Sequence, residues 1–100
     1  MPELCCAMLC PLDVEEKLLD ELLSRFPDEV FTSTHTHGHG LAHEALSAAE
    51  QVLGRARGLL VQILLTQAEW AEFKPALLRQ FRGTGLRYWT TPVLEAGGCA

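Results

Sequence analysis

The chain has few basic residues, and they are not clustered. Eight Lys and Arg stand against thirteen Asp and Glu over 100 residues, which gives a net charge of −5. Proteins that bind nucleic acid neutralise its phosphates with grouped Lys and Arg side chains. The lack of such a group argues against DNA or RNA as a partner.

Long apolar runs and a basic leader are missing as well. The apolar run Leu59–Leu65 is far shorter than the ~20 residues that cross a bilayer. Glu3 stands where a secretory signal carries its positive charge. Cys5 and Cys6 are adjacent in a predicted strand and point to opposite faces, which favours free thiols in a reducing compartment. We therefore expect a cytoplasmic protein that is not inserted in a membrane.

Motifs of the common catalytic sites are also absent. The chain has no Ser-His-Asp order, no nucleophile in a glycine elbow, no paired carboxylates and no phosphate-binding glycine loop. A pair formed by Cys10 and one of the histidines stays an alternative. The sequence predicts a protein that is not an enzyme.

What the chain does contain is a series of apolar strands and amphipathic helices. The continuous apolar run Leu4–Cys10 indicates a strand buried on both faces. Asp13 and Glu16 match a capping box, which predicts a helix from there to Phe26. Residues 29–37 are rich in β-branched side chains and favour a second strand.

The second half repeats the strand and helix pattern. Leu59–Thr66 predicts another buried strand, followed by an amphipathic helix. Proline is tolerated in the first turn of a helix, so Pro75 predicts a helix that begins around Glu72. Leu86–Val93 predicts the last strand, and its Pro92 indicates an edge position.

The predicted order is βαββαβ, which indicates one ferredoxin-like α+β domain over residues 1–100. Its expected form is a four-stranded antiparallel sheet with two helices on one face. A loop is expected at about 38–48 and a loose tail at about 95–100. Because the central strands are apolar on both faces, the second sheet face is expected to pack against other subunits of a homo-oligomer.

All four histidines fall in one short window, as His35, His37, His39 and His43. On a strand every second side chain points to the same face, about 6–7 Å apart, so two or three imidazoles can converge on one ion. Imidazole suits Cu, Zn, Ni and Co. The window therefore predicts a transition-metal site; the alternative is a solvated Gly/His loop without a ligand.

Sulfur ligands form a second, weaker pattern in the first strand. Cys6, Met8 and Cys10 alternate on one face, in an order that suits copper(I). Cys and Met also pack well in protein cores, and this interpretation is favoured. Cys10, at the strand end, is expected to be the most accessible of the three.

Three blocks of the sequence, 46–55, 86–89 and 92–94, resemble a small bacterial family of PII-like proteins, DUF3240. The resemblance implies a trimer, kinship with PII and CutA-type proteins, and a membrane transporter such as a metal efflux system as protein partner. It also implies a cofactor site at the loop base, for which Glu50, Arg55 and Arg87 are the candidates; for Glu50 and Arg55 a salt bridge between subunits is the favoured alternative, and Arg87 could form a stacking surface or pack at an interface. PII proteins bind adenine nucleotides there, but this chain lacks their phosphate loop and has no Lys or Arg after residue 93, which argues against ATP.

Three hypotheses follow for the function. The first is a PII-like regulator that binds a transition metal through the histidine window and signals to a protein partner. The second is a sensor of a nucleotide or small anionic metabolite, with Arg55, Arg57, Arg82 and Arg87 as anion contacts. The third is a structural adaptor in which the histidines have no role.

Overall fold

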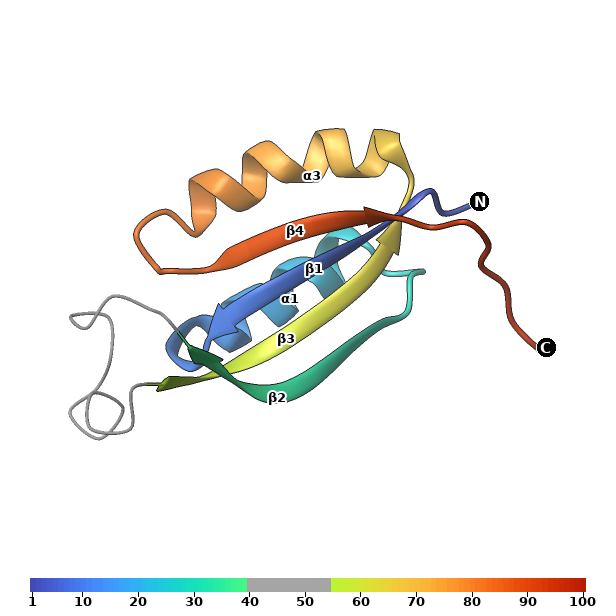
Figure 1. Ribbon diagram of the computed structural model, residues 1–100. Helices are drawn as coiled ribbons and strands as arrows, with labels where there is room; N and C mark the ends of the chain where they lie inside the picture. Colours follow the sequence, from blue (N-terminus) through green and yellow to red (C-terminus); the bar gives the residue numbers. More distant parts are fainter. Residues whose placement is uncertain (40–54) are drawn as a thin grey trace.

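The computed structural model describes residues 1–39 and 55–100, which form a single sheet with helices packed on it (Figure 1). Its elements are β1 Leu4–Pro11, a 3₁₀ turn η1 Leu12–Val14, α1 Glu15–Arg25, β2 Phe31–His39, β3 Arg55–Leu65, α3 Gln67–Gln80 and β4 Arg87–Pro92. Strands and α-helices follow the order βαββαβ, so the predicted ferredoxin-like α+β fold is confirmed. No helix in the described ranges is long and apolar enough to cross a membrane.

The sheet has the strand order β2-β3-β1-β4, and every neighbouring pair is antiparallel. β1 lies inside the sheet between β3 and β4, as its apolar sequence predicts. β4 is an edge strand, which agrees with the position of Pro92 at its end. β2 forms the other edge and, within the described residues, pairs with β3 alone.

Alternation along the two central strands separates a helix-covered face from an open one. On the covered face every second residue of β1 lies opposite a residue of β3, and both are buried against the helices. These opposed pairs are Leu4–Leu65, Cys6–Ile63, Met8–Val61 and Cys10–Leu59. Each residue of the four pairs is at most 4% exposed, so these eight side chains form the floor of the core.

The open face carries apolar side chains that no described helix covers. Leu9 lies opposite Leu60, Cys5 lies opposite Leu64, and all four are half-buried. Trp89 of β4 lies across from Ala7 and is 46% exposed. The contact between subunits that the sequence predicts for this face stays a prediction.

Aromatic contacts connect the helices over the covered face. The Phe73 ring of α3 is fully buried and meets Phe26 edge-on, with ring centroids 5.4 Å apart. Trp70 packs against Phe73 at 6.1 Å and against Tyr88 of β4 at 5.4 Å. Such pairs contribute about 0.5–1.5 kcal/mol each beyond the area that they bury, so Phe73 is a central contact between α1 and α3.

The predicted starts of both helices are wrong. Asp13 lies inside the 3₁₀ turn rather than at a cap, and α1 begins at Glu15 after Val14 with no side-chain cap. α3 begins at Gln67, well before Glu72, because the Thr66 side chain accepts a hydrogen bond from the Glu69 backbone N–H and completes a capping box. Pro75 therefore lies within the helix, between the buried residues Phe73 and Ala76.

The bounds of β2 and β3 also differ from the predicted ones. β2 begins at Phe31 and continues through Gly38 and His39, two residues that were expected in the loop. β3 begins at Arg55 instead of Leu59, because hydrogen bonding to β2 extends the strand through a segment that is not apolar. The rest of the predicted loop lies in residues 40–54, outside the described residues.

Phe73→Ala is expected to destabilise the fold by about 3–5 kcal/mol, because a cavity replaces the ring between the helices. The measurement is the free energy of unfolding from urea titrations of both proteins. Leu78→Ala is the matched control in the same helix; Leu78 is 48% exposed, and its loss should have a much smaller effect. Equal losses for the two variants would contradict the central place of Phe73.

Candidate functional site

The sheet narrows to two strands at the end where β1 stops. The last paired residue of β1 is Pro11, opposite Gly58, and Gly58 also lies opposite Thr36 of β2. Among the described residues, 37–39 and 55–57 alone continue the sheet beyond this row, and we call them the β2–β3 ribbon. β2 ends at His39.

Three of the four histidines lie on the covered side of β2. Phe31, at the start of the strand, packs against the core, and every second residue after it points to the same side. His35, His37 and His39 follow this alternation and are exposed; we call them the histidine row. His35 lies opposite Leu59, the last buried residue of β3 on this face, so the row begins where the core ends.

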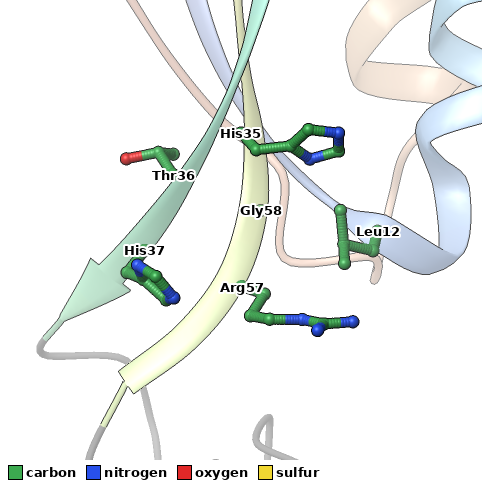
Figure 2. A pocket seen from close by; sticks show the side chains of 6 residues that line it. All are labelled: Leu12, His35, Thr36, His37, Arg57 and Gly58. Atoms are coloured by element: carbon green, nitrogen blue, oxygen red, sulfur yellow. The ribbon is translucent and has the colours of Figure 1, made fainter.

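A pocket of about 290 Å³ opens beside the histidine row (Figure 2). Its lining residues are Leu12, His35, Thr36, His37, Arg57 and Gly58. Figure 2 shows His35 and Arg57 extending to the side where Leu12 lies, with the Thr36 hydroxyl on the other side of the ribbon. Both imidazole and guanidinium groups therefore border one pocket.

Gly58 keeps the ribbon close to β1 at the floor of this pocket. A Cβ atom at this position would lie 3.1 Å from the backbone oxygen of Cys10 and 3.5 Å from a Leu9 methyl group. A side chain would have to displace the β1 backbone, because the closest atom is part of the main chain. The close approach of backbones explains a glycine within a strand.

The register places arginines directly opposite two of the histidines. His37 faces Arg57, and His39 faces Arg55. Directly opposite residues in an antiparallel pair have Cβ atoms about 4.5–5.5 Å apart, so the two side chains start from neighbouring positions, and in Figure 2 the Arg57 guanidinium extends toward Leu12. Its positive charge in the pocket disfavours a metal cation and favours an anion. The sequence named Arg57 as an anion contact but not as a cofactor residue, because its position opposite His37 depends on a register that the sequence does not show.

Of the remaining predicted site residues, Arg55 pairs with the histidine row at His39, and Arg87 lies apart from it. Arg87 lies on β4 opposite Leu9, across β1 from β3, and its side chain is exposed. Arg55 begins β3, while His43 and Glu50 lie outside the described residues. Across residues 1–39 and 55–100, no three His, Cys, Asp or Glu side chains form a group that could hold a metal ion.

Two of the three cysteines of β1, Cys6 and Cys10, belong to the core. Cys6, Met8 and Cys10 have no exposed surface, as the packing interpretation predicts, and the expectation that Cys10 is accessible is wrong. Burial and the nearby Cys5 raise the pKa of Cys6 to about 12. Burial and the carboxylates of Glu15 and Asp13 raise the pKa of Cys10 to about 11. Both thiols are therefore neutral at physiological pH, which disfavours metal ligation and nucleophilic chemistry.

The strand order and the one-sided helix layer define a ferredoxin-like protein, and comparisons with known proteins identify its family. A family model described as "Protein of unknown function (DUF3240)" matches residues 1–100. The chain belongs to the DUF3240 family, which confirms the resemblance seen in the sequence. It is also similar to the crystal structure of a DUF3240 family protein from Shewanella baltica OS155, with a TM-score of 0.78 and 17% identity over 100% of this chain and 99% of the other. This likeness shows the fold, and no curated protein matches the chain.

The thiols are expected to separate into two classes when a disulfide reagent is added. Cys99 is exposed and Cys5 is half-buried, so both should react in the native protein, with Cys99 faster. Raising the pH from 7 to 9 should leave Cys6 and Cys10 protected, because the folded-state pKa of each buried thiol stays above this range. The measurement is reagent release over time, with and without urea.

Cys99→Ser is the control for this experiment and should remove the fast phase alone. The same pKa shifts give the sign of a stability effect. A folded-state pKa raised above the ordinary value stabilises the fold below about pH 9, and this contribution falls as pH rises toward the folded pKa. Labelling of Cys6 and Cys10 as fast as Cys99 in the native protein would contradict their burial.

Proposed function

We propose that this chain is a non-enzymatic regulatory protein that binds a transition-metal ion through the histidine row and signals this to a protein partner. The observation that carries the proposal is that His35, His37 and His39 lie on the same side of an edge strand and that all three side chains are exposed. Membership of the DUF3240 family does not select the function, because the family is described as one of unknown function.

The chemistry of the row suits borderline metal ions. Neutral imidazole binds Zn at about 2.0–2.1 Å and also suits Cu, Ni and Co. Neighbouring histidines of the row are one two-residue step apart, about 6–7 Å, so two of them can turn toward one ion. Exposure leaves the imidazoles free to change rotamer at little energetic cost. Two neighbouring histidines, His35 with His37 or His37 with His39, can therefore bind one ion with two imidazoles.

The position of the row explains how binding would become a signal. The row lies at the end of β2 and continues into the ribbon, whose strands, within the described residues, pair only with each other beyond Pro11. Few packing contacts hold a two-stranded ribbon, and such elements are marginally stable without further strands. A bound ion stabilises the conformation that binds it, and a partner that contacts this end of the sheet would respond. By kinship with PII-like proteins, the proposed partner is a membrane transporter and the regulator is a homo-oligomer.

The register favours a second candidate function, the sensing of a small anion. Arg57 lies opposite His37, and both border the same pocket with His35. Guanidinium and imidazolium groups bind carboxylate and phosphate oxygens with charge-assisted hydrogen bonds. A small anionic metabolite in this pocket would use the same residues without a metal.

Titration calorimetry of the reduced, metal-free protein with Zn(II), Cu(II), Ni(II) and Co(II) tests the first function. We expect at least one ion to bind more tightly than ~0.1 mM. The triple variant His35→Ala, His37→Ala and His39→Ala should lose this binding, because no other described group of ligands can replace the row.

Thr32→Ala and Thr34→Ala together make the matched control. Both threonines lie on β2, on the side opposite to the histidines, and outside the pocket lining, so their loss should leave metal affinity unchanged. Metal binding that survives in the histidine variant, or is absent from the natural sequence, would reject the histidine row as the metal site.

Arg57→Gln distinguishes the metal function from the anion function, because the two respond with opposite signs. Removing a positive charge from the pocket that His35 and His37 border should raise metal affinity a few-fold at moderate ionic strength. The same change should weaken binding of a phosphate or carboxylate probe. The measurement is calorimetry with Zn(II) and with inorganic phosphate, and weaker binding of Zn(II) by the variant would contradict the metal function.

A further inference from the structure

One chain supplies too few ligands for a closed metal site. Structural Zn sites are almost always four-coordinate, and the spacing of the histidine row lets two neighbouring imidazoles reach one ion. Within residues 1–39 and 55–100, no third His, Cys, Asp or Glu completes such a group. A four-coordinate ion bound by two neighbouring histidines of the row therefore needs a second pair of ligands from outside the described part of the same chain.

The missing pair of ligands would lie at the outer edge of β2. This edge extends over nine residues, Phe31–His39, and within the described residues β2 pairs with β3 alone. Proline, lysine and inward-pointing charges commonly protect edge strands from pairing with another chain, and β2 contains none of these residues. The opposite edge, β4, is shorter and ends in Pro92. The edge that carries the histidines is thus the better one for strand addition.

We infer that the histidine row of β2 is completed by the histidine row of a second copy of this chain, which pairs antiparallel with β2 and shares one metal ion with it. This inference rests on the proposed function, since it specifies how the same histidines hold the metal. The second copy is the occupant because a two-fold axis brings the same ligands to the same edge.

Antiparallel pairing about a two-fold axis at His37 fulfils the ligand requirement. His37 then faces His37 of the other copy. His35 of each copy faces His39 of the other, because residue numbers rise along one strand while they fall along its antiparallel partner. Directly opposite side chains lie on the same face with Cβ atoms about 4.5–5.5 Å apart, so imidazoles from both strands can turn toward one ion. His37 and His39 of one copy, with His37 and His35 of the other, make four ligands.

This arrangement determines the stoichiometry. The two-fold axis also generates a second possible set, His37 and His35 of the first copy with His37 and His39 of the other. Both sets need the same two His37 side chains, so only one of them can hold an ion at a time. A pair of chains therefore binds one ion, which is half an ion per chain. Metal binding and association are coupled, because each stabilises the other.

The test combines calorimetry with light scattering on the full chain, using Zn(II) as the probe. We expect a stoichiometry of half an ion per chain and a higher particle mass on Zn(II) addition, reversed by a chelator. His35→Ala and His39→Ala should each weaken Zn(II) binding at least tenfold when measured alone, since each homodimer keeps three of the four ligands in either set.

Mixing these two variants is the decisive measurement. One copy with His35→Ala and one with His39→Ala still contribute both His37 side chains, one His39 and one His35, which restores a full set of four. The equimolar mixture should therefore recover the affinity of the natural sequence. The mixture of His37→Ala with either variant is the control, and it should not recover affinity.

The outcomes separate this inference from the proposed function. A mixture that behaves as the average of its components, with one ion per chain and no change in mass, would overturn the shared site and leave metal binding by the single chain intact. An absence of Zn(II) binding by the natural sequence would overturn both. Recovery in the mixture supports the shared site, because no single chain in it carries the complete row.

Discussion

The structure depends on the pairing of β1 with β3 in one register. In this register four residues of each strand lie opposite each other on the covered face, and all eight are buried. Side chains alternate with a period of two, so a slip by one residue would turn this set to the open face. The helices pack on the surface that the pairing creates, with Phe73 of α3 fully buried among them.

The candidate site inherits its geometry from the same pairing. β2 takes its register from β3, and Phe31 and His35 therefore belong to the covered face, opposite Ile63 and Leu59. β1 ends at Pro11, where the chain turns into the 3₁₀ turn and α1. His37 and His39 lie past this level, have no core to cover and are exposed. His35 lies opposite Leu59 at the margin of the core, on an edge strand, and is exposed as well.

The charge around the histidine row affects whether the row binds a metal cation or an anion. A histidine is neutral or positive near physiological pH, and Arg57 adds a permanent positive charge opposite His37. A metal ion requires neutral imidazoles and is repelled by the guanidinium, whereas an anion gains from both groups. The balance depends on the number of imidazoles that reach one ion, since each metal–nitrogen bond outweighs the repulsion of one solvated charge.

The amino-acid sequence by itself determined the strand and helix order, the central place of β1 and the edge place of β4. Apolar periodicity in Leu4–Cys10 and the position of Pro92 are local properties, and the fold preserves them. Helix starts were less predictable, because Asp13 and Thr66 both fit the pattern of a cap and the sequence does not say which side chain is directed at a backbone N–H.

Only the tertiary structure decided which side of β2 carries the histidines and which residues lie beside them. The alternation of His35, His37 and His39 is visible in the sequence, but the position of Arg57 opposite His37 is set by hydrogen bonds between strands far apart in the chain. The same holds for Cys10, which a strand-end position suggested to be accessible and which α1 and β3 bury. Local patterns specify elements, whereas register and burial result from the packing of all elements together.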